Sequence, residues 1–316
     1  MKAKYVALGD LVVDCYYRKT KQNGRESIQL IKVDGGSSRF NVIANLAARK
    51  NDTAVISGYG NNELGFIAFD SLKRLNVDVS KTKKAGDETR AYHLIVEGDK
   101  HISTKICPIC GKRTWYEPQI ADTDYCLSRL NPNDIIILDG LKPENIPILK
   151  EAKNEKVLDI GRVKRLQKLT NVEILTAVRE NNIQILQLNE SVERYIKQHF
   201  RLKNILEVFY LLGPEFLIVT RGKNGADFVD RNGVIYQKEL SHPTYEKDDT
   251  GAGDAFFSMF IQKYYDNSKK VDKYFIDSTF DMASKLTSNV VSHIGARGHL
   301  YDGYYLDVDM DSNCIC

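Results

Sequence analysis

The chain has 316 residues, of which 42% are hydrophobic and 28% are charged, so an ordinary globular core is possible without disulfides or a structural metal. The net charge is only +3, and the lysines and arginines are spread along the chain, which argues against nucleic acid or a membrane surface as a partner. The sequence has no apolar run of about 18 residues, and its N-terminus lacks the apolar stretch of a signal peptide. We therefore expect a cytoplasmic protein.

The first half of the chain alternates short apolar runs with segments of helical periodicity. Residues 6–9 predict a first strand that ends in a turn. A helix over 41–49 and a strand over 54–57 follow. After a glycine-rich turn at 58–62, a helix is predicted over 63–75.

The second half repeats this alternation and ends in two long helices. Four apolar runs predict strands, and two periodic segments predict helices: 135–138, 157–160, 183–188 and 216–219, then 253–265 and 271–293. Strands that alternate with helices indicate an α/β fold with a doubly wound, mostly parallel sheet covered by helices on both faces.

Two segments break the alternation, at about 14–34 and 88–118. Both are rich in Tyr, Ile, Thr and Val with near period-two patterning, so we expect antiparallel strands that form a small β lid. With no linker or repeat in the sequence, we expect one domain over 1–316 that carries this lid. Lid strands expose sheet edges, so we also expect a homodimer formed through the lid.

The strongest motif is the run Asp-Thr-Gly-Ala-Gly-Asp-Ala-Phe at 249–256. Gly251, Ala252 and Gly253 allow close approach to the backbone N–H groups at the positive end of the following helix, which is an anion site. Asp254 adds a carboxylate at the same helix start, a pairing that suits phosphoryl transfer. In the alternative interpretation, Asp254 only caps the helix and the glycines only permit the turn.

Further segments occur in the order expected of one family. They are Gly-Asp-Leu-Val-Val-Asp at 9–14, Gly35-Gly36 with Asn41, the glycine-rich 58–65, Val-Thr-Arg-Gly-Lys-Asn-Gly-Ala at 219–226, and Gly295-Ala296. Together with the run at 248–256, they resemble the ribokinase family, which includes the phosphofructokinase-B branch, over nearly the whole chain. The resemblance implies a ribokinase-like fold. It also implies ATP-dependent phosphotransfer to a hydroxyl of a sugar or sugar-like molecule.

The same resemblance implies a role for each matched residue. Asp254 would be the general base, and Gly251, Ala252 and Gly253 would form the anion hole. Contacts with the acceptor would come from Asp14, Gly36 and Asn41. The nucleotide would be bound by Asn189, Thr220, Gly222 and Gly225. Mg²⁺ would accompany ATP without a metal cage built from protein ligands.

The sequence departs from the family pattern at three places. Val192 stands where the family often has Glu after Asn189, and Glu190 or Glu193 could substitute for it. The loop before Asn41 is one residue longer than usual. Asn62 occupies a position where Asp is more frequent.

Arg90, at the start of the second lid segment, is a candidate to bind a phosphate already present on the acceptor. Lys32 and Arg39 could assist it. The alternative is a solvated surface arginine. A phosphosugar and an unphosphorylated sugar or nucleoside therefore both stay open as acceptors.

Cys107-Pro108-Ile109-Cys110-Gly111 has the spacing of half a zinc site. Free lid cysteines are the favoured interpretation, with zinc and a redox pair as alternatives. Further ligands would have to come from other cysteines or histidines: Cys126, Cys314, Cys316, His93 and His101. The rival to a kinase is a non-catalytic binding protein on the same fold, with this pair as a metal or interaction module.

Overall fold

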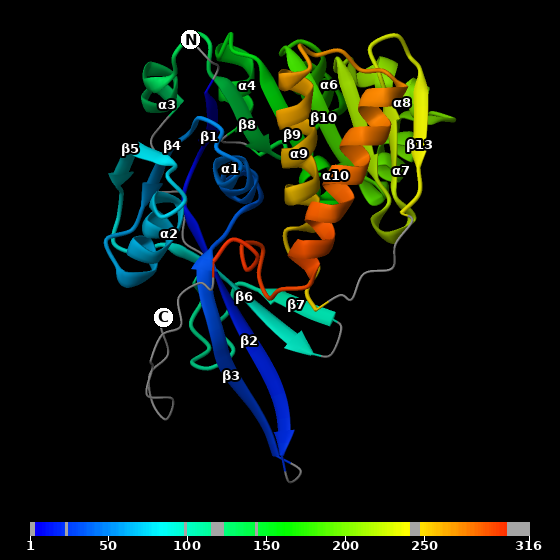
Figure 1. The fold of residues 1–316 in the computed structure, drawn as a ribbon. Helices are drawn as coiled ribbons and strands as arrows, with labels where there is room; N and C mark the ends of the chain where they lie inside the picture. The colour runs from blue at the N-terminus through cyan, green and yellow to red at the C-terminus, as the bar shows by residue number, and fades with distance from the viewer. Residues whose placement is uncertain are drawn as a thin grey trace. The chain divides into compact units, whose positions relative to one another are not determined.

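The computed structural model describes residues 4–22, 25–97, 100–114, 123–142, 145–240 and 247–301 (Figure 1). The chain separates into two compact units. One comprises 1–8, 122–243 and 256–284, and the other comprises 9–121, 244–255 and 285–316. Cys314, Cys316 and the end of the second predicted lid segment lie outside the described residues.

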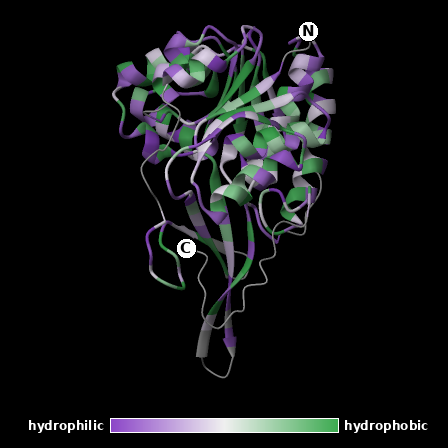
Figure 2. Ribbon diagram, turned by 90° about the vertical axis from the view of Figure 1, so that its left-hand side faces the viewer, coloured by the Kyte–Doolittle hydropathy of each residue, from purple (hydrophilic) through white to green (hydrophobic). Residues whose placement is uncertain are grey.

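The first unit contains a largely parallel sheet of short apolar strands. The strand order is β13-β12-β11-β10-β9-β8-β1. The strands from β11 to β1 in this order pair in parallel, whereas β12 pairs antiparallel with both β11 and β13. The central strands are buried along their length because both faces are covered, as their continuous aliphatic runs indicate (Figure 2). The bounds are β1 Tyr5–Leu8, β8 Ile135–Asp139, β9 Lys156–Ile160, β10 Ile183–Asn189, β11 Phe216–Thr220, β12 Ala226–Val229 and β13 Ile235–Lys238.

Helices surround these strands. Stacked phenylalanines form part of the core, with the rings of Phe228 and Phe260 5.0 Å apart. The bounds are α3 Thr123–Arg129, α4 Asn145–Glu151, α5 Val163–Leu166, α6 Asn171–Arg179, α7 Glu190–Phe200, α8 Ile205–Leu212, α9 Ala252–Asp266 and α10 Lys273–Val291. None of the helices among the described residues is long and apolar enough to cross a bilayer.

The second unit holds a pair of parallel strands, two helices and a separate four-stranded sheet in the order β3-β2-β6-β7. The paired strands are β4 and β5, and the helices α1 and α2 each follow a strand. The bounds are β2 Val12–Gln22, β3 Arg25–Gly35, α1 Ser38–Ala48, β4 Thr53–Tyr59, α2 Glu63–Lys73, β5 Asp78–Lys84, β6 Arg90–Glu97 and β7 Lys100–Thr104.

The predicted α/β fold with a mostly parallel sheet and a small lid sheet is confirmed. The expectation of purely antiparallel lid strands is wrong, because β2 and β6 pair in parallel while β2–β3 and β6–β7 are antiparallel hairpins. The connection from β3 to β6 passes through α1, β4, α2 and β5, a crossover long enough to bring β6 back in the same direction as β2. The single-domain organisation stays a prediction.

Candidate active site

The glycine turn before α9 is fixed by a carboxylate. Asp248 accepts hydrogen bonds from the Thr250 backbone N–H at 3.0 Å and from its hydroxyl at 2.6 Å, and another from the Gly295 N–H at 2.8 Å. Gly251 has φ +84°, and a Cβ atom there would lie 2.5 Å from the Cβ of Ala296. The turn therefore requires glycine at 251 and is joined to the loop that follows α10.

Asp254 lies in the first turn of α9, where its charge is favoured by the helix dipole. Both of its carboxylate oxygens accept hydrogen bonds from the first turn of α1. The Ser38 hydroxyl donates to Oδ1, and the Asn41 side-chain amide donates to Oδ2 at 2.8 Å. The predicted base and the predicted acceptor residue Asn41 are thus in direct contact, and the carboxylate is held in one orientation.

A buried arginine orients Asn41. Arg297 is 1% exposed, and its Nε donates to the Asn41 Oδ1 at 3.0 Å, which leaves the amide nitrogen of Asn41 toward Asp254. Its terminal nitrogens donate to the Ser71 hydroxyl at 2.8 Å and to the Gly36 carbonyl at 3.2 Å. No sequence pattern points to Arg297, because its partners lie more than 200 residues away along the chain.

Asp14 is buried beside the same loop. A Cβ atom at Gly36 would lie 2.4 Å from the Asp14 carboxyl carbon, so glycine at 36 makes room for this side chain. Burial raises the pKa of Asp14 to about 7, the Arg297 guanidinium opposes the increase, and neighbouring carboxylates, Asp34 first, add to it. Asp14 and Gly36, both predicted to contact the acceptor, therefore lie together.

The loop before Asn41 turns sharply at Ser37. This residue has φ +75°, and α1 begins at the next residue. The loop thereby brings Ser38, another residue to which no sequence pattern points, to Asp254. The departure at Asn62 also has a physical explanation, since its side chain caps α2 by accepting from the Gly65 N–H at 2.9 Å, as Asp would.

Arg90 is not a solvated surface arginine. Its side chain is 11% exposed and forms an ion pair with Asp10 at 3.0 Å. Arg39 is also buried, and a Cβ atom at Gly9 would lie 2.6 Å from its guanidinium carbon. Lys32 donates to the Ile294 carbonyl at 3.1 Å. Arg90, Arg39 and Lys32, the three cations predicted to bind a phosphate, therefore all lie against other groups of the protein.

A cavity of about 370 Å³ adjoins Lys32 in the second unit. Its wall is mainly basic or apolar, and Ile294 within it directly precedes Gly295 of the loop that follows α10. Such a wall suits an anionic group. The lining residues are Arg18, Ile31, Lys32, Lys247, His293, Ile294 and Gly298.

The residues predicted to bind the nucleotide lie in the first unit, at the carboxyl ends of β10 and β11. Asn189 and Thr220 are paired in register on these parallel strands. Asn189 caps α7 by accepting from the Val192 N–H at 3.0 Å, and it donates to the Gly161 carbonyl at 2.8 Å. Ligands of open α/β sheets bind at this edge.

A glycine turn follows β11. Gly225 has φ +95°, and a Cβ atom there would lie 1.9 Å from the Lys238 carbonyl oxygen, so this position requires glycine. Gly222 has φ +57°, and a Cβ atom there would meet nothing within 4 Å. Gly225 therefore packs the turn against β13, and Gly222 leaves open space beside the backbone.

Glu193, a candidate substitute for the missing family Glu, is buried in ion pairs. Its carboxylate contacts Arg221 at 2.9 Å and Lys197 at 3.1 Å. Arg221 also donates to Asp227 at 2.7 Å. This network holds the residue after Thr220 in place. Among the described residues, no group of three or more His, Cys, Asp or Glu side chains could hold a metal ion.

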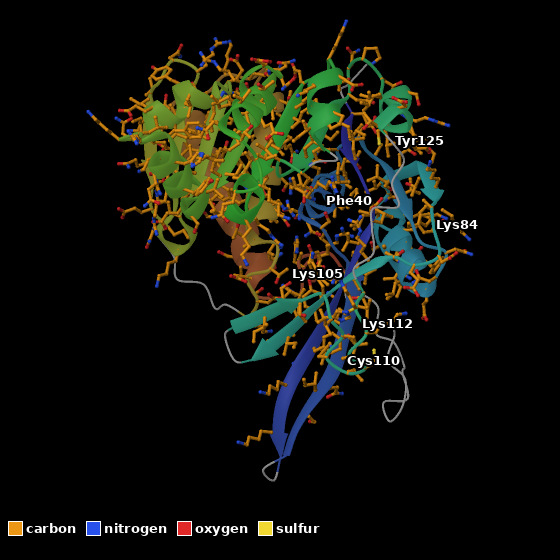
Figure 3. All side chains as sticks on the ribbon, turned by 180° about the vertical axis from the view of Figure 1, so that it is seen from behind. Phe40, Lys84, Lys105, Cys110, Lys112 and Tyr125 are labelled. Atoms are coloured by element: carbon orange, nitrogen blue, oxygen red, sulfur yellow. The ribbon has the colours of Figure 1, made fainter. Side chains whose placement is uncertain are left out.

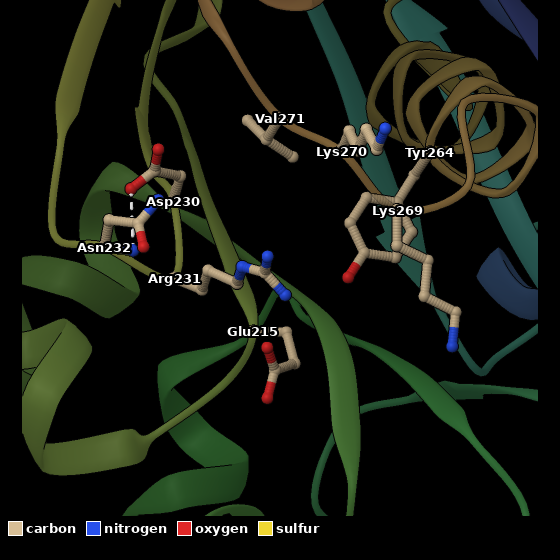
Figure 4. Close-up of a pocket in the computed structure, with 8 residues that line it drawn as sticks. All are labelled: Glu215, Asp230, Arg231, Asn232, Tyr264, Lys269, Lys270 and Val271. Carbon is tan, nitrogen blue, oxygen red and sulfur yellow. Dashed lines mark hydrogen bonds between the residues drawn. The ribbon is translucent and has the colours of Figure 1, made fainter.

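A small polar pocket of about 120 Å³ also lies in the first unit, and its lining contains none of the predicted site residues (Figure 4). Within it, Asp230 accepts a hydrogen bond from the Asn232 N–H at 2.9 Å. The lining residues are Glu215, Asp230, Arg231, Asn232, Tyr264, Lys269, Lys270 and Val271.

The chain is similar to known carbohydrate and nucleoside kinases. A model of the pfkB family of carbohydrate kinases matches residues 2–300. The chain is 26% identical over 259 residues to the ATP-dependent ribose-1-phosphate kinase of Halopiger xanaduensis, covering 77% of this chain and 78% of the relative. It is 25% identical over 245 residues to the guanosine-inosine kinase of Exiguobacterium acetylicum, covering 73% and 76%. The nucleoside kinase structure of Methanocaldococcus jannaschii superposes with a TM-score of 0.71 at 18% identity and covers 94% of both chains.

Proposed function

Because the chain belongs to the pfkB family of carbohydrate kinases, we propose that it transfers a phosphoryl group from ATP to a hydroxyl of a ribosyl compound. Ribose is the part that ribose 1-phosphate, guanosine and inosine share, and these are the acceptors named for the two curated relatives. A ribosyl acceptor is a sugar-like molecule of the kind expected from the sequence.

The observation that carries the proposal is the position of Asp254. Its carboxylate lies at the first turn of α9, directly after the glycine turn, and is oriented by Ser38 and Asn41. Each carboxylate oxygen has two lone pairs, so both can accept these bonds and still accept one from an acceptor hydroxyl. A base held beside an anion-binding helix start is what transfer to a hydroxyl requires.

The chain's residues would act in the following way. Asp14, in the space that Gly36 leaves, would accept hydrogen bonds from sugar hydroxyls and orient the acceptor. Asp254 would take the proton of the attacking hydroxyl as its oxygen forms the bond to phosphorus. The backbone N–H groups of Gly251, Ala252 and Gly253 would donate toward the charge that develops on the transferred group.

ATP fits the donor set of the first unit. Thr220 and Asn189 would contact the phosphates at the strand ends, and the open face of Gly222 would let the nucleotide approach the backbone. Bound ATP would supply the phosphoryl group, and Mg²⁺ carried with it would offset phosphate charge.

A phosphosugar is the acceptor class that the basic cavity favours. Arg18, Lys32 and Lys247 line it, and an anionic substituent on the ribose would find complementary charge there. A nucleoside would make less use of these cations.

The lid has two free-standing edges, β3 and β7, among the described strands of its sheet. Pairing of such edges between two copies would bury their backbone donors and acceptors, so we propose a homodimer through the lid. Light scattering of the purified protein tests this assembly.

The kinase proposal is tested by ADP release from MgATP with ribose, ribose phosphates, guanosine and inosine, followed by mass spectrometry of the product. Turnover with a ribosyl acceptor and a mass increase of one phosphate on it would support the proposal. ATP binding without turnover on any acceptor would contradict it and would favour the non-catalytic binding protein.

A further inference from the structure

The residues proposed to bind the nucleotide carry no charge; they are Asn189, Thr220, Gly222 and Gly225. The triphosphate of ATP carries several negative charges, and enzymes that transfer its terminal group place cations against them. Mg²⁺ offsets only part of this charge. A positively charged side chain at the carboxyl edge of the sheet in the first unit would complete the donor set.

Arg221 directly follows β11 at this edge, but its guanidinium is engaged by two carboxylates. Its Nη1 donates to Glu193 at 2.9 Å, and its Nε donates to Asp227 at 2.7 Å. Its Nη2 lies 2.5 Å from the same Asp227 oxygen. Because two negative charges offset one positive charge, Arg221 is not suited to a further anion.

Arg165, in the loop region after β9, is held against the end of β8. Its Nη1 donates to the Asp139 carbonyl at 3.2 Å and lies 3.8 Å from a carboxylate oxygen of the same residue. The next residue, Leu166, is fully buried and anchors α5. Gly140 has φ +74°, and a Cβ atom there would lie 2.5 Å from Nη1 of Arg165. Glycine at 140 therefore makes room for the guanidinium.

The guanidinium of Arg165 keeps donors for a ligand. Its side chain is 25% exposed, and in the part of the chain that the structure describes its Nε and Nη2 have no hydrogen-bond or ion-pair partner. Lys142 contacts both carboxylate oxygens of Asp139, at 2.8 and 2.9 Å. These three side chains thus carry two positive charges and one negative charge. An open guanidinium edge in such a setting suits two oxygens of a phosphate.

Hydrogen bonds connect this cluster to β10, the strand that ends at Asn189. Asp139 and Asp159 are in register on β8 and β9, and the Gly140 N–H donates to the Asp159 carbonyl at 2.6 Å. From β10, the Gln187 side-chain amide donates to Asp159 Oδ1 at 3.3 Å. β8 lies two strand spacings, about 10 Å, from β10. Groups at both strand ends can therefore line one nucleotide site.

We propose that Arg165, positioned by Asp139 and Gly140, binds a phosphate of the nucleotide. This inference rests on the proposed kinase function and adds the cation that the neutral nucleotide groups lack. Arg165 would strengthen binding of the triphosphate and would leave the nucleoside part to other residues. A phosphate on the acceptor has the same chemistry, so the test separates the two sources.

Calorimetric titration with MgATP and with adenosine, which has no phosphate, tests the proposal. In Arg165→Gln, the Kd for MgATP should rise about 10- to 100-fold, because charge-assisted hydrogen bonds are lost. In Arg165→Lys the rise should be smaller, because lysine keeps the charge without the planar fork. The Kd for adenosine should stay unchanged in both variants.

Arg129→Gln is the matched control. Arg129 is an exposed arginine of α3, and its guanidinium carbon lies 5.1 Å from the ring centroid of Tyr125, which is labelled in Figure 3. α3 ends before β8 begins, so Arg129 precedes the strand whose far end holds Asp139. Its substitution should leave the Kd for MgATP and for adenosine unchanged.

The wild type gives a second readout that does not depend on the folding of a variant. Phenylglyoxal modifies accessible arginines, and peptide mass spectrometry measures the modification of Arg165 and Arg129. MgATP should protect Arg165 and leave Arg129 reactive. Adenosine and ribose 5-phosphate should protect neither arginine.

Three results would overturn the proposal. Modification of Arg165 at the same rate with and without MgATP would show that no nucleotide phosphate contacts it. An equal loss of affinity for MgATP and adenosine in Arg165→Gln would show a structural role only. Protection by ribose 5-phosphate in place of MgATP would assign Arg165 to the acceptor.

The proposed function can fail separately, because nucleotide binding is measured without turnover. A wild type in which MgATP protects Arg165 but no acceptor is phosphorylated would support this inference and contradict the kinase activity. Turnover with unchanged affinity for MgATP in Arg165→Gln would have the opposite meaning.

Discussion

The proposed acceptor region of the second unit and the proposed nucleotide region of the first unit hold their polar groups in different ways. Around Asp254, the groups are buried side chains joined across long stretches of sequence, as in the contacts of Asn41 with Asp254 and Arg297. In the proposed nucleotide region, the groups are strand ends and a glycine turn, and Asn189 is hydrogen-bonded to Val192, three positions away, and to Gly161, 28 positions away. Substitutions should therefore have larger and more coupled effects in the acceptor region than in the nucleotide region.

The largest effect is expected for Asp254→Asn. The amide keeps the shape of the side chain but cannot take a proton, so kcat should fall by about 10²–10⁴-fold while ATP binding is retained. Steady-state kinetics and calorimetric titration with ATP measure the two quantities. Asp266→Asn, at the exposed far end of α9, is the control and should leave kcat unchanged. Equal activity of Asp254→Asn and the wild type would remove Asp254 as the base.

The Asp14→Asn variant should have a kcat/KM lower by about 10- to 100-fold, because it loses a charge-assisted hydrogen bond to the acceptor. Its thermal stability should be higher than that of the wild type. Burial raises the pKa of Asp14 from 3.8 to about 7, so the folded state binds this proton more tightly than the unfolded chain does. Ionisation of Asp14 therefore destabilises the folded protein, and this loss of stability grows as the pH rises from 3.8 to about 7.

Thermal unfolding of the wild type and Asp14→Asn at pH 4 and pH 8 measures this cost. The Tm advantage of the variant should be small at pH 4 and larger at pH 8. Asp52→Asn, at an exposed position, serves as the control. An advantage that does not depend on pH would show that Asp14 ionises in the folded protein as it does in the unfolded chain.

These two carboxylates illustrate what the sequence could predict. Asp14 and Asp254 lie in motifs that match the family pattern in residue type and order, and the fold follows from alternating apolar runs. Ser38 and Arg297 could not be predicted, because each acts through a contact that is distant along the chain. Ser38 contacts Asp254 across 216 positions, and Arg297 contacts Asn41 across 256 positions. The parallel β2–β6 pairing was missed for a related reason, since strand direction is set by the crossover between them rather than by the strands' own residues.

Arg297→Lys tests whether the missed residue acts through Asn41. Lysine keeps a positive charge but cannot donate in three fixed directions, so Asn41 should lose its orientation and kcat/KM should fall about tenfold. The pKa of Asp14 should also rise if the charge moves away, which would shift the acidic limb of the pH–rate profile upward. Arg74→Lys, on the exposed end of α2, is the control and should change neither kcat/KM nor the pH–rate profile. A loss of stability with an unchanged profile would indicate a structural role only.

Gly253→Ala probes the anion hole without disturbing the free protein. A Cβ atom at 253 meets nothing within 4 Å, so stability should be retained. The methyl group would occupy the approach to the helix start, and kcat should fall severalfold, less than the loss of a donor at about 10²-fold. Gly251→Ala is the contrasting variant, because φ +84° and the clash with Ala296 should lower its Tm. Full activity of Gly253→Ala would place the transferred group elsewhere.

The smallest effect is expected for Arg18→Ala, and it distinguishes the two acceptor classes. Arg18 lines the basic cavity but is exposed, so its contribution to binding a phosphate should resemble that of a surface ion pair. For a ribose phosphate, KM should rise about fivefold, and added salt should reduce the difference because solvent ions screen the interaction. For guanosine or inosine, KM should stay unchanged. Lys21→Ala, on the same strand outside the cavity lining, should affect neither acceptor. An equal rise in KM for both classes would mean that Arg18 contacts the ribose or shapes the lid. Only an interaction of Arg18 with the phosphate of the acceptor would raise KM for ribose phosphates alone.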